Sequence, residues 1–193
     1  MNSTSLMIAA GILTILGNGR YALTAYRGST RPNILSWSLW SVIPLIMFFA
    51  QRAGGTGSQS YLSLAVGLTP ILVVFSAWLG THLSYKVKPA DLVCIAICVI
   101  ALILWALTGK SIVAVIISII AGSYASLLTL LHGYHHPEEE NVVPFVCGII
   151  SAAITLLTMQ SFYFMAGAFA IYLLISNAAL AFVIGAFPRL KKP

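Results

Sequence analysis

The side chains best suited to binding a metal or moving a proton lie in one short stretch. His132, His135 and His136 are followed, after Pro137, by the acidic run 138–140. Imidazole and carboxylate groups are common metal ligands, and His132 and His136 would share a face if a helix continued through them. The residue before a proline is disfavoured in a helix. We therefore favour a solvated polar turn, and predict neither a metal site nor a bound cofactor.

Acidic residues are scarce elsewhere. The chain has four Asp and Glu against ten Lys and Arg. Asp91 opens a long apolar run and the other three form the 138–140 stretch, so no carboxylate lies within an apolar run. Ion-coupled membrane transport relies on carboxylates or His buried in the bundle, and glycoside hydrolysis relies on a pair of carboxylates. The sequence therefore predicts a passive activity without ion coupling, and no enzyme.

Two polar residues interrupt the apolar runs. Arg20 lies six residues before Arg27, about 9 Å along a helix. Its side chain either reaches the membrane surface or a structural partner, or lines a cavity where it would attract an anionic group. Asn177 lies in the middle of the last run, where its amide must bond either to neighbouring helices or to a ligand. Both alternatives stay open for each residue.

The composition is that of a membrane protein. Of the 193 residues, 60% are hydrophobic and 7% are charged, whereas soluble domains are about 25% charged. This excludes a soluble monomer, a nucleic-acid-binding domain and a disordered chain. The net charge of +6 comes from residues between the apolar runs, as in proteins whose loops flank a bilayer. The expected partner is therefore the lipid bilayer, and not nucleic acid.

Seven apolar runs are long enough to cross a bilayer, which takes roughly 20 helical residues. Glycine, proline and polar residues separate them. We predict an all-α, polytopic membrane protein whose seven transmembrane helices cover residues 5–26, 34–51, 61–79, 90–108, 111–131, 142–160 and 162–187.

The basic residues predict how these helices are oriented. With alternating helices, one side receives Arg27, Arg31, Lys86, Lys88, Arg189, Lys191 and Lys192. The other side receives only Arg52 and Lys110. Lys and Arg favour the cytoplasmic side. We therefore expect an outside amino terminus and a cytoplasmic carboxyl terminus, in a bacterial cytoplasmic membrane.

The first and fifth connections have similar patterns. Each places Pro, Pro32 or Pro137, before an apolar run that opens with an aromatic residue, Trp37 or Phe145. The offset is 105 residues at the prolines and 108 at the aromatic residues. We therefore predict two parallel three-helix repeats, residues 1–80 and 111–193, joined by a linker helix in residues 81–110. Parallel repeats are one of the known plans of transporters.

This layout, together with the motif Thr30-Arg31-Pro32-Asn33…Ser36-Trp37…Trp40, resembles the SWEET and PQ-loop transporter superfamily, whose half-size bacterial members are the SemiSWEETs. The resemblance covers essentially the whole chain and points to a bacterial branch. It implies a transporter of a small polar solute, a sugar or similar metabolite, that works by alternating access. In that family an Asn in the third helix of each repeat faces the substrate. Asn177 has this place in the second copy and Thr69 in the first.

The resemblance also implies pocket-facing residues near the ends of the second and sixth runs. The expected lining is Asn177, Thr69, Gln51, Gln160, Trp40 and Tyr21. Pro44 and Pro70 lie inside helices, where they free carbonyl groups and can act as hinges. We expect passive uniport; a receptor, sensor or scaffold on the same fold is the alternative, which a closed, dry interior would favour. Either reading allows a homo-oligomer.

Overall fold

The computed structural model describes residues 3–57, 60–81, 89–159 and 164–186, which are almost entirely helical. The helices are α1 (Ser3–Tyr26), α2 (Ile34–Ala53), α3 (Ser60–Thr81), α4 (Pro89–Thr108), α5 (Ser111–His135), α6 (Val143–Leu157) and α7 (Phe164–Ala181). A 3-10 turn, η1 (Pro137–Glu139), precedes α6, and a π-helical turn, η2 (Phe182–Ala186), continues α7. The all-α prediction is confirmed over the described residues.

Five helices, α1, α2, α3, α5 and α7, are long and apolar enough to cross a membrane, which indicates an integral membrane protein. The predicted sixth span, 142–160, is shorter: α6 has 15 residues. Its first turn contains Pro144, and it ends where the backbone N–H of Thr158 bonds back to the carbonyl of Ile154. The prediction that the fifth helix ends at residue 131 is wrong, because α5 continues through His135.

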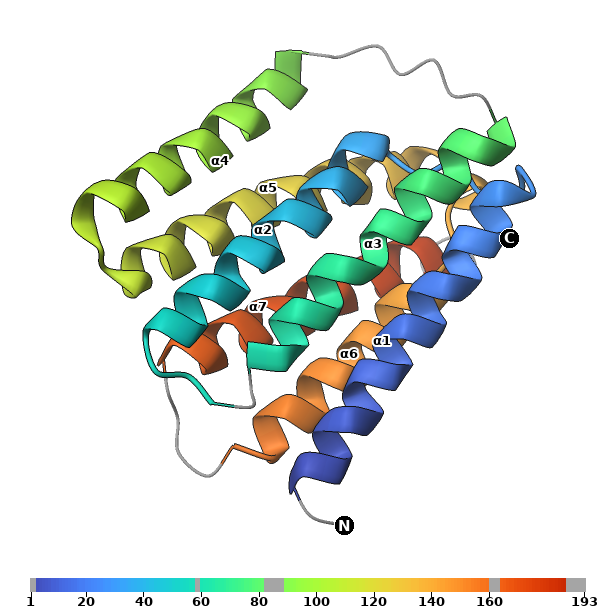
Figure 1. Cartoon of the computed structure of the whole chain (residues 1–193). Helices are drawn as coiled ribbons and strands as arrows, with labels where there is room; N and C mark the ends of the chain where they lie inside the picture. The colour runs from blue at the N-terminus through green and yellow to red at the C-terminus, as the bar shows by residue number, and fades with distance from the viewer. Residues whose placement is uncertain (1–2, 58–59, 82–88, 160–163, 187–193) are drawn as a thin grey trace.

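The helices α1, α2, α3, α5, α6 and α7 pack together in one bundle (Figure 1). We call α1–α3 the first triplet and α5–α7 the second. In the first triplet α3 packs against both α1 and α2, and in the second α7 packs against both α5 and α6. Between the triplets, α1 packs against α6 and α2 against α5. α4 lies at the edge of the bundle and packs mainly against α5 (Figure 1).

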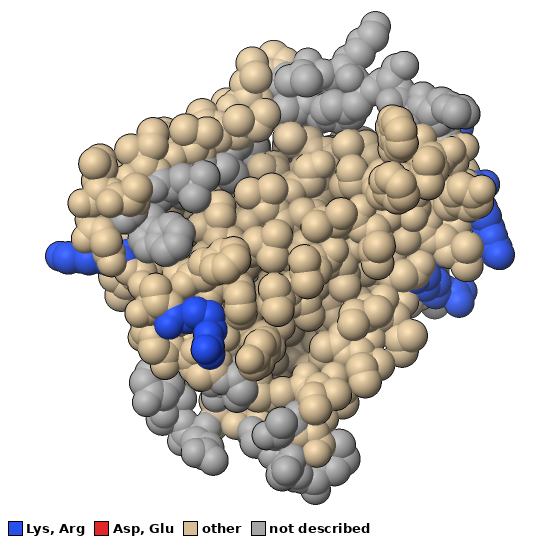
Figure 2. All heavy atoms as spheres, in the orientation of Figure 1, with Lys and Arg blue, Asp and Glu red and all other residues tan. Residues whose placement is uncertain are grey.

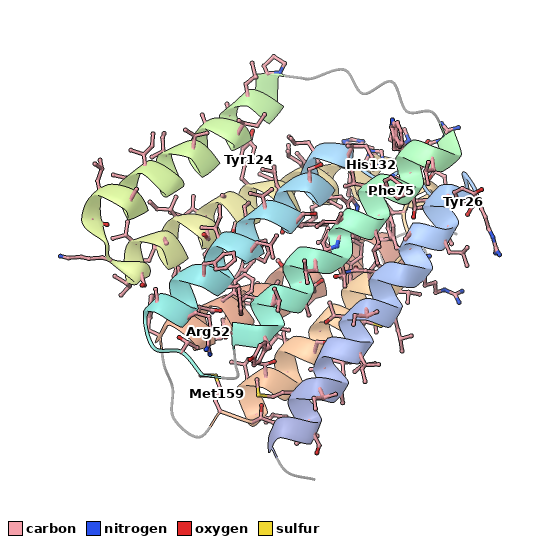
Figure 3. All side chains as sticks on the ribbon, viewed as in Figure 1. Tyr26, Arg52, Phe75, Tyr124, His132 and Met159 are labelled. Atoms are coloured by element: carbon pink, nitrogen blue, oxygen red, sulfur yellow. The ribbon has the colours of Figure 1, made fainter. Side chains whose placement is uncertain are left out.

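Successive helices run in opposite directions, so their connections gather at two ends (Figure 3). The His132 end comprises the connections 27–33 and 136–142 with the adjoining helix ends. The Arg52 end comprises residues 54–57 and 109–110, with Met159 just beyond the end of α6. On the face shown in Figure 2, Lys and Arg lie towards these ends and the surface between them carries no charge. Large apolar side chains such as Leu16, Phe75 and Trp78 are exposed, as lipid-facing side chains would be.

Two apolar clusters inside the bundle lie one near each end, and a third, formed by Leu39, Ile43, Ala121 and Ala125, joins α2 to α5. The His132-end cluster consists of Tyr21, Ala22, Ala25, Trp37, Val73, Ala77, Phe145, Leu180 and Ile184. The Arg52-end cluster consists of Met47, Leu62, Val115, Ala152, Phe169, Ala170 and Leu173. Each of these two end clusters draws residues from both triplets, so each joins the triplets at one end.

Small residues allow the triplets to approach closely. A Cβ at Gly17 of α1 would lie 2.8 Å from the Cβ of Cys147 on α6 and 3.1 Å from the Cα of Pro144. Only glycine therefore fits at this crossing, in the way that small residues let membrane helices pack backbone against backbone.

Candidate functional site

A cavity lies between the two triplets, between the two apolar clusters. Its volume of about 70 Å³ for the centres of water-sized molecules is several times what a single water needs. Both triplets contribute to its walls, and none of the described side chains of α4 lines it. The lining residues are Thr14, Asn18, Trp37, Trp40, Ile43, Pro44, Leu62, Val66, Pro70, Gly122, Pro144, Phe145, Gly148, Ser151, Phe169, Tyr172, Leu173, Ser176, Asn177 and Leu180.

Hydroxyl and amide groups form a polar layer in the middle of this cavity. Asn18 donates from Nδ2 to Oγ1 of Thr69 over 2.5 Å. Thr14 donates to Oγ of Ser151 over 3.2 Å, and Ser151 donates to the carbonyl of Ala10 over 2.8 Å. The Thr14–Ser151 contact joins α1 to α6 and therefore links the triplets. No charged side chain lines the cavity among the residues that the structure describes, so the site suits a neutral polar solute.

The amide of Asn177 points from α7 towards α6. Its Nδ2 donates to the carbonyl of Leu173 in its own helix over 2.7 Å. A Cβ at Gly148 would lie 2.7 Å from its Oδ1, so the bare backbone of α6 makes room for the amide. Within the described part of the chain Oδ1 accepts no hydrogen bond. Because a buried amide carbonyl is costly to leave unbonded, this oxygen is available to water or a solute.

Aromatic rings form the wall at the His132 end. The rings of Trp37 and Trp40 pack edge to face with centroids 5.4 Å apart, and those of Trp40 and Phe145 with centroids 6.2 Å apart. Behind them, Tyr21 packs against Trp37 with a centroid separation of 4.4 Å. The Trp40–Phe145 contact crosses between the triplets, since Phe145 belongs to α6, whereas the other two contacts lie within the first triplet.

The two predicted hinge prolines lie on the cavity wall. Pro44 and Pro70 are both buried within helices, α2 and α3 respectively. Proline has no N–H, so each frees the carbonyl four residues earlier. Those carbonyls belong to Trp40 and Val66, which line the cavity as well. The prolines therefore place backbone acceptors near the site, and whether they act as hinges stays a prediction.

Of the other residues predicted to line the site, two line the cavity and three do not. Trp40 and Asn177 line the cavity, whereas Thr69 lies behind Asn18 and holds it in place. Gln51 is buried near the Arg52 end, where its Oε1 accepts a 2.7 Å hydrogen bond from Ser63. Tyr21 lies behind the aromatic wall. Thr69, Gln51 and Tyr21 therefore lie outside the lining of this cavity, and their role in binding a solute stays a prediction.

Two predicted residues lie away from the cavity or beyond the structure. Arg20 is exposed on α1 and makes no ion pair with any described residue. Of the two alternatives for Arg20, this favours a side chain that extends to the membrane surface. Gln160 lies outside the described residues. Sequence reasoning missed Asn18, Ser151 and Ser176 as lining residues. The sequence Gly17-Asn18-Gly19 was the available signal for Asn18, because small neighbours allow close packing around a polar side chain.

The acidic stretch 138–140 does not form a fully solvated turn. None of the Glu140 side chain is exposed, whereas 69% of the Glu138 side chain is. The Tyr21 hydroxyl donates to Oε2 of Glu140 over 2.7 Å, and Nε2 of His132 lies 4.0 Å from Oε1. Burial raises the pKa of Glu140 from 4.5 to about 8. The premise that no carboxylate is buried in the bundle is therefore wrong.

The neighbours of Glu140 join the two triplets. The Arg31 backbone N–H donates to the carbonyl of Glu139 over 2.8 Å, and the Arg31 guanidinium lies 3.3 Å from Oε1 of Glu139. Asn141 donates from Nδ2 to Oγ1 of Thr24 over 3.5 Å. Arg31 and Thr24 belong to the first triplet or its connection, while Glu139 and Asn141 lead into α6. The connection 136–142 therefore docks on the first triplet.

The His residues of this connection are not arranged as a metal site. His136 leaves the helical conformation with φ −132° and ψ 60°, as expected before Pro137. The rings of His132 and His136 are 5.6 Å apart. No group of three His, Cys, Asp or Glu side chains could hold a metal ion in the described part of the chain.

No family model, curated protein or solved structure matches this chain. Its function is therefore argued from the cavity and from the helices that surround it.

Proposed function

We propose that this protein is a membrane transporter that carries a small, neutral, polar solute by passive uniport. The observation that carries the proposal is the cavity between the triplets, which has a polar layer in its middle and an apolar cluster at each end. A site that is reached alternately from two sides needs such a closure at each end. The amides of Asn18 and Asn177 and the hydroxyls of Thr14, Ser151 and Ser176 would bind the solute. The aromatic rings would pack against its apolar faces.

The helix contacts support two parallel repeats, as in the SWEET and PQ-loop plan. Exchanging α1 with α5, α2 with α6, and α3 with α7 reproduces the pattern of packing. The α1–α3 contact becomes α5–α7, α2–α3 becomes α6–α7, and α1–α6 becomes α5–α2. In this reading α4 is the linker helix, which brings the second triplet back to the orientation of the first. Rocking of one triplet against the other would move the opening of the cavity from one end to the other.

The proposed orientation rests on the distribution of Lys and Arg along the sequence. Among the described residues the two ends are equal, with Arg27 and Arg31 at the His132 end and Arg52 and Lys110 at the Arg52 end. The positive-inside tendency places the His132 end in the cytoplasm and the amino terminus outside.

The test is flux of labelled sugars, polyols and other neutral metabolites into liposomes that contain the purified protein. Replacing Asn177 by Ala removes the amide from the cavity, and about tenfold slower flux is expected for the loss of roughly one hydrogen bond of about 1.4 kcal/mol. Ile175→Ala is the matched control, because Ile175 lies on the same helix but 65% of it is exposed. Equal flux in the Asn177→Ala and Ile175→Ala proteins would contradict the assigned site. If folded protein carries no solute in the panel, the receptor or scaffold alternative would gain support.

A further inference from the structure

The buried carboxyl of Glu140 has no role in the cavity, because the aromatic wall separates them. Tyr21, Trp37 and Phe145 belong to the His132-end cluster, and Glu140 bonds to the far side of it through the Tyr21 hydroxyl. The residues that lead from Glu140 to solution are His132 and Glu139, whose side chains are each 26% exposed. Protons therefore reach Glu140 from the His132 end and not through the cavity.

We propose that Glu140 is a proton-binding latch, whose protonated carboxyl holds the two triplets together at the His132 end and whose deprotonation releases them. The latch consists of Glu140 with Tyr21, His132 and Glu139. The inference rests on the proposed function in one respect, namely that release opens the cavity to the cytoplasm. It makes the protein a uniporter gated by cytoplasmic pH.

The position of Glu140 is what makes it a latch. Its side chain comes from the connection between α5 and α6, in the second triplet, and its hydrogen-bond partner Tyr21 comes from α1, in the first. Gly133 leaves room beside Glu140 for Ile184: a Cβ there would lie 2.7 Å from Cγ1 of Ile184, and 3.8 Å from Cγ of Glu140 in ordinary van der Waals contact. The triplets cannot separate at this end without withdrawing Glu140 from its buried position.

The groups that face Glu140 decide how it responds to pH. From α1 the Tyr21 hydroxyl donates to it, and from α5 His132 lies between it and Glu139. Glu139 repels a negative charge on Glu140 and is itself paired with Arg31. From η2 the neighbouring side chain is the apolar Ile184. In the described part of the chain, no cation other than His132, when protonated, faces the carboxyl directly.

The direction of the effect follows from the two states of the carboxyl. Docked, the pKa of Glu140 is about 8; undocked in water, it would return towards 4.5. Between these pH values the docked state holds one proton more than the undocked state. Rising pH therefore favours undocking, by up to about tenfold per pH unit. Below about pH 4.5 both states are protonated and the ratio no longer changes.

The experiment measures the separation of the triplets directly, in the full-length protein in lipid nanodiscs. Nitroxide spin labels are placed at Arg27→Cys and His135→Cys, both exposed at the His132 end, after the native cysteines are replaced by Ala. A single short distance is expected at pH 5. At pH 9 a second, longer distance is expected, with at least a tenfold rise in its population. Glu140→Gln keeps the shape of the carboxyl but cannot ionise, so it should hold the short distance at both pH values.

Glu138→Gln is the matched control, because Glu138 is two residues away and exposed; it should behave like the parent protein. An unchanged distance between pH 5 and pH 9 in the parent protein would overturn the latch, whether or not the Glu140→Gln protein folds. Solute flux with no pH-dependent separation contradicts the latch and leaves the transport proposal intact. A pH-dependent separation in protein that carries no solute supports the latch and contradicts transport.

Discussion

The two ends of the bundle close in different ways. At the Arg52 end the triplets meet through an apolar cluster, and the buried polar pair there, Gln51 with Ser63, lies within the first triplet. At the His132 end the apolar cluster is backed by polar contacts that cross between the triplets, from Tyr21 to Glu140 and from Arg31 to Glu139. Every ion pair among the described residues lies at this end.

The packing that joins the triplets at each end is therefore distinct from the titratable group that could regulate how an end opens. Apolar packing closes both ends and does not depend on pH, because no group in it titrates in the physiological range. Among the described residues, only those at the His132 end include a buried carboxyl whose charge can change, and burial is what moves its pKa into that range. The two ends can therefore be similar in packing and yet differ in how they open. The predictions that follow test this asymmetry, beginning with the largest expected effect.

Replacing Gln51 by Glu should give the Arg52 end a pH dependence that it lacks. Gln51 is 1% exposed, and burial would raise the pKa of a carboxyl at this position. Stability would then be retained below the unfolded-state pKa of about 4.3 and lost as pH rises through the folded-state value. For a shift of about 2 units the loss at pH 9 is about 3 kcal/mol. Thermal unfolding in detergent from pH 5 to pH 9 measures it.

The control is Gln51→Met, which keeps the length of the side chain without a titratable group. It should destabilise by a similar amount at every pH. If the stability of the Gln51→Glu protein depended on pH no more than that of the Gln51→Met protein, burial of a carboxyl would not be what makes an end pH-dependent. The proposed difference between the two ends would then be contradicted.

Replacing Gly17 by Ala should weaken the packing between the triplets, midway between the ends. The added Cβ would meet the Cβ of Cys147 at 2.8 Å. Overpacking of this kind costs about 2 kcal/mol, which exceeds the gain of up to about 1 kcal/mol from the better helix propensity of Ala. Gly11→Ala on the same helix has open space around its Cβ and should be neutral or stabilising. Opposite signs for the two variants in thermal unfolding are expected; a loss of equal size in both would contradict the close crossing.

Replacing Tyr21 by Phe should sharpen the assignment of the latch. The hydrogen bond from Tyr21 stabilises the ionised form and so lowers the pKa of Glu140. Without it the pKa rises further, and the upper limit of the pH window for undocking moves about one unit higher, which corresponds to about 1.4 kcal/mol. Spin-label distances across a pH series measure this limit. Tyr26→Phe, exposed on the same helix, should leave it in place.

The smallest effect is expected at the ion pair between Arg31 and Glu139. The Arg31 side chain is 69% exposed, and exposed pairs contribute less than about 1 kcal/mol. Arg31→Gln should therefore lower the melting temperature slightly at low salt and leave it unchanged at high salt. A large loss that persists at high salt would show that the ion pair, and not Glu140, holds this end together.

Much of the architecture could be predicted from the sequence. The long apolar runs place α1, α2, α3 and α5 close to their observed positions, because about 20 apolar residues form a helix wherever no water can satisfy the backbone. The end of α5 and the length of α6 could not be predicted as well. His132 and His135 read as loop residues, yet the helix continues through them until the residue before Pro137 breaks it. The polarity of these residues did not predict where α5 ends, because the connection packs against the bundle.

The candidate site was predicted only in part. Trp40, Pro44, Pro70 and Asn177 line the cavity, and each carried a local signal: an aromatic residue one turn into a helix, a proline within a helix, or an amide in an apolar run. Thr69 and Gln51 carried the same kind of signal but do not line the cavity: Thr69 bonds to the lining residue Asn18, and Gln51 bonds to Ser63 outside the lining. A polar residue in an apolar run needs a hydrogen-bond partner, but the packing of the neighbouring helices determines which partner lies within reach.

The sequence by itself determined the helical class, the apolar character of the helices and where the charged residues fall, because these depend on composition and on periodicity along the chain. Only the tertiary structure decided that Glu140 is buried. Its neighbours in the sequence are Glu139 and Asn141, but its environment consists of Tyr21, His132 and Gly133, up to 119 residues away. Desolvation depends on the density of atoms around a group in space. The same carboxylate is therefore a solvated charge when read along the chain and a proton-binding group in the folded bundle.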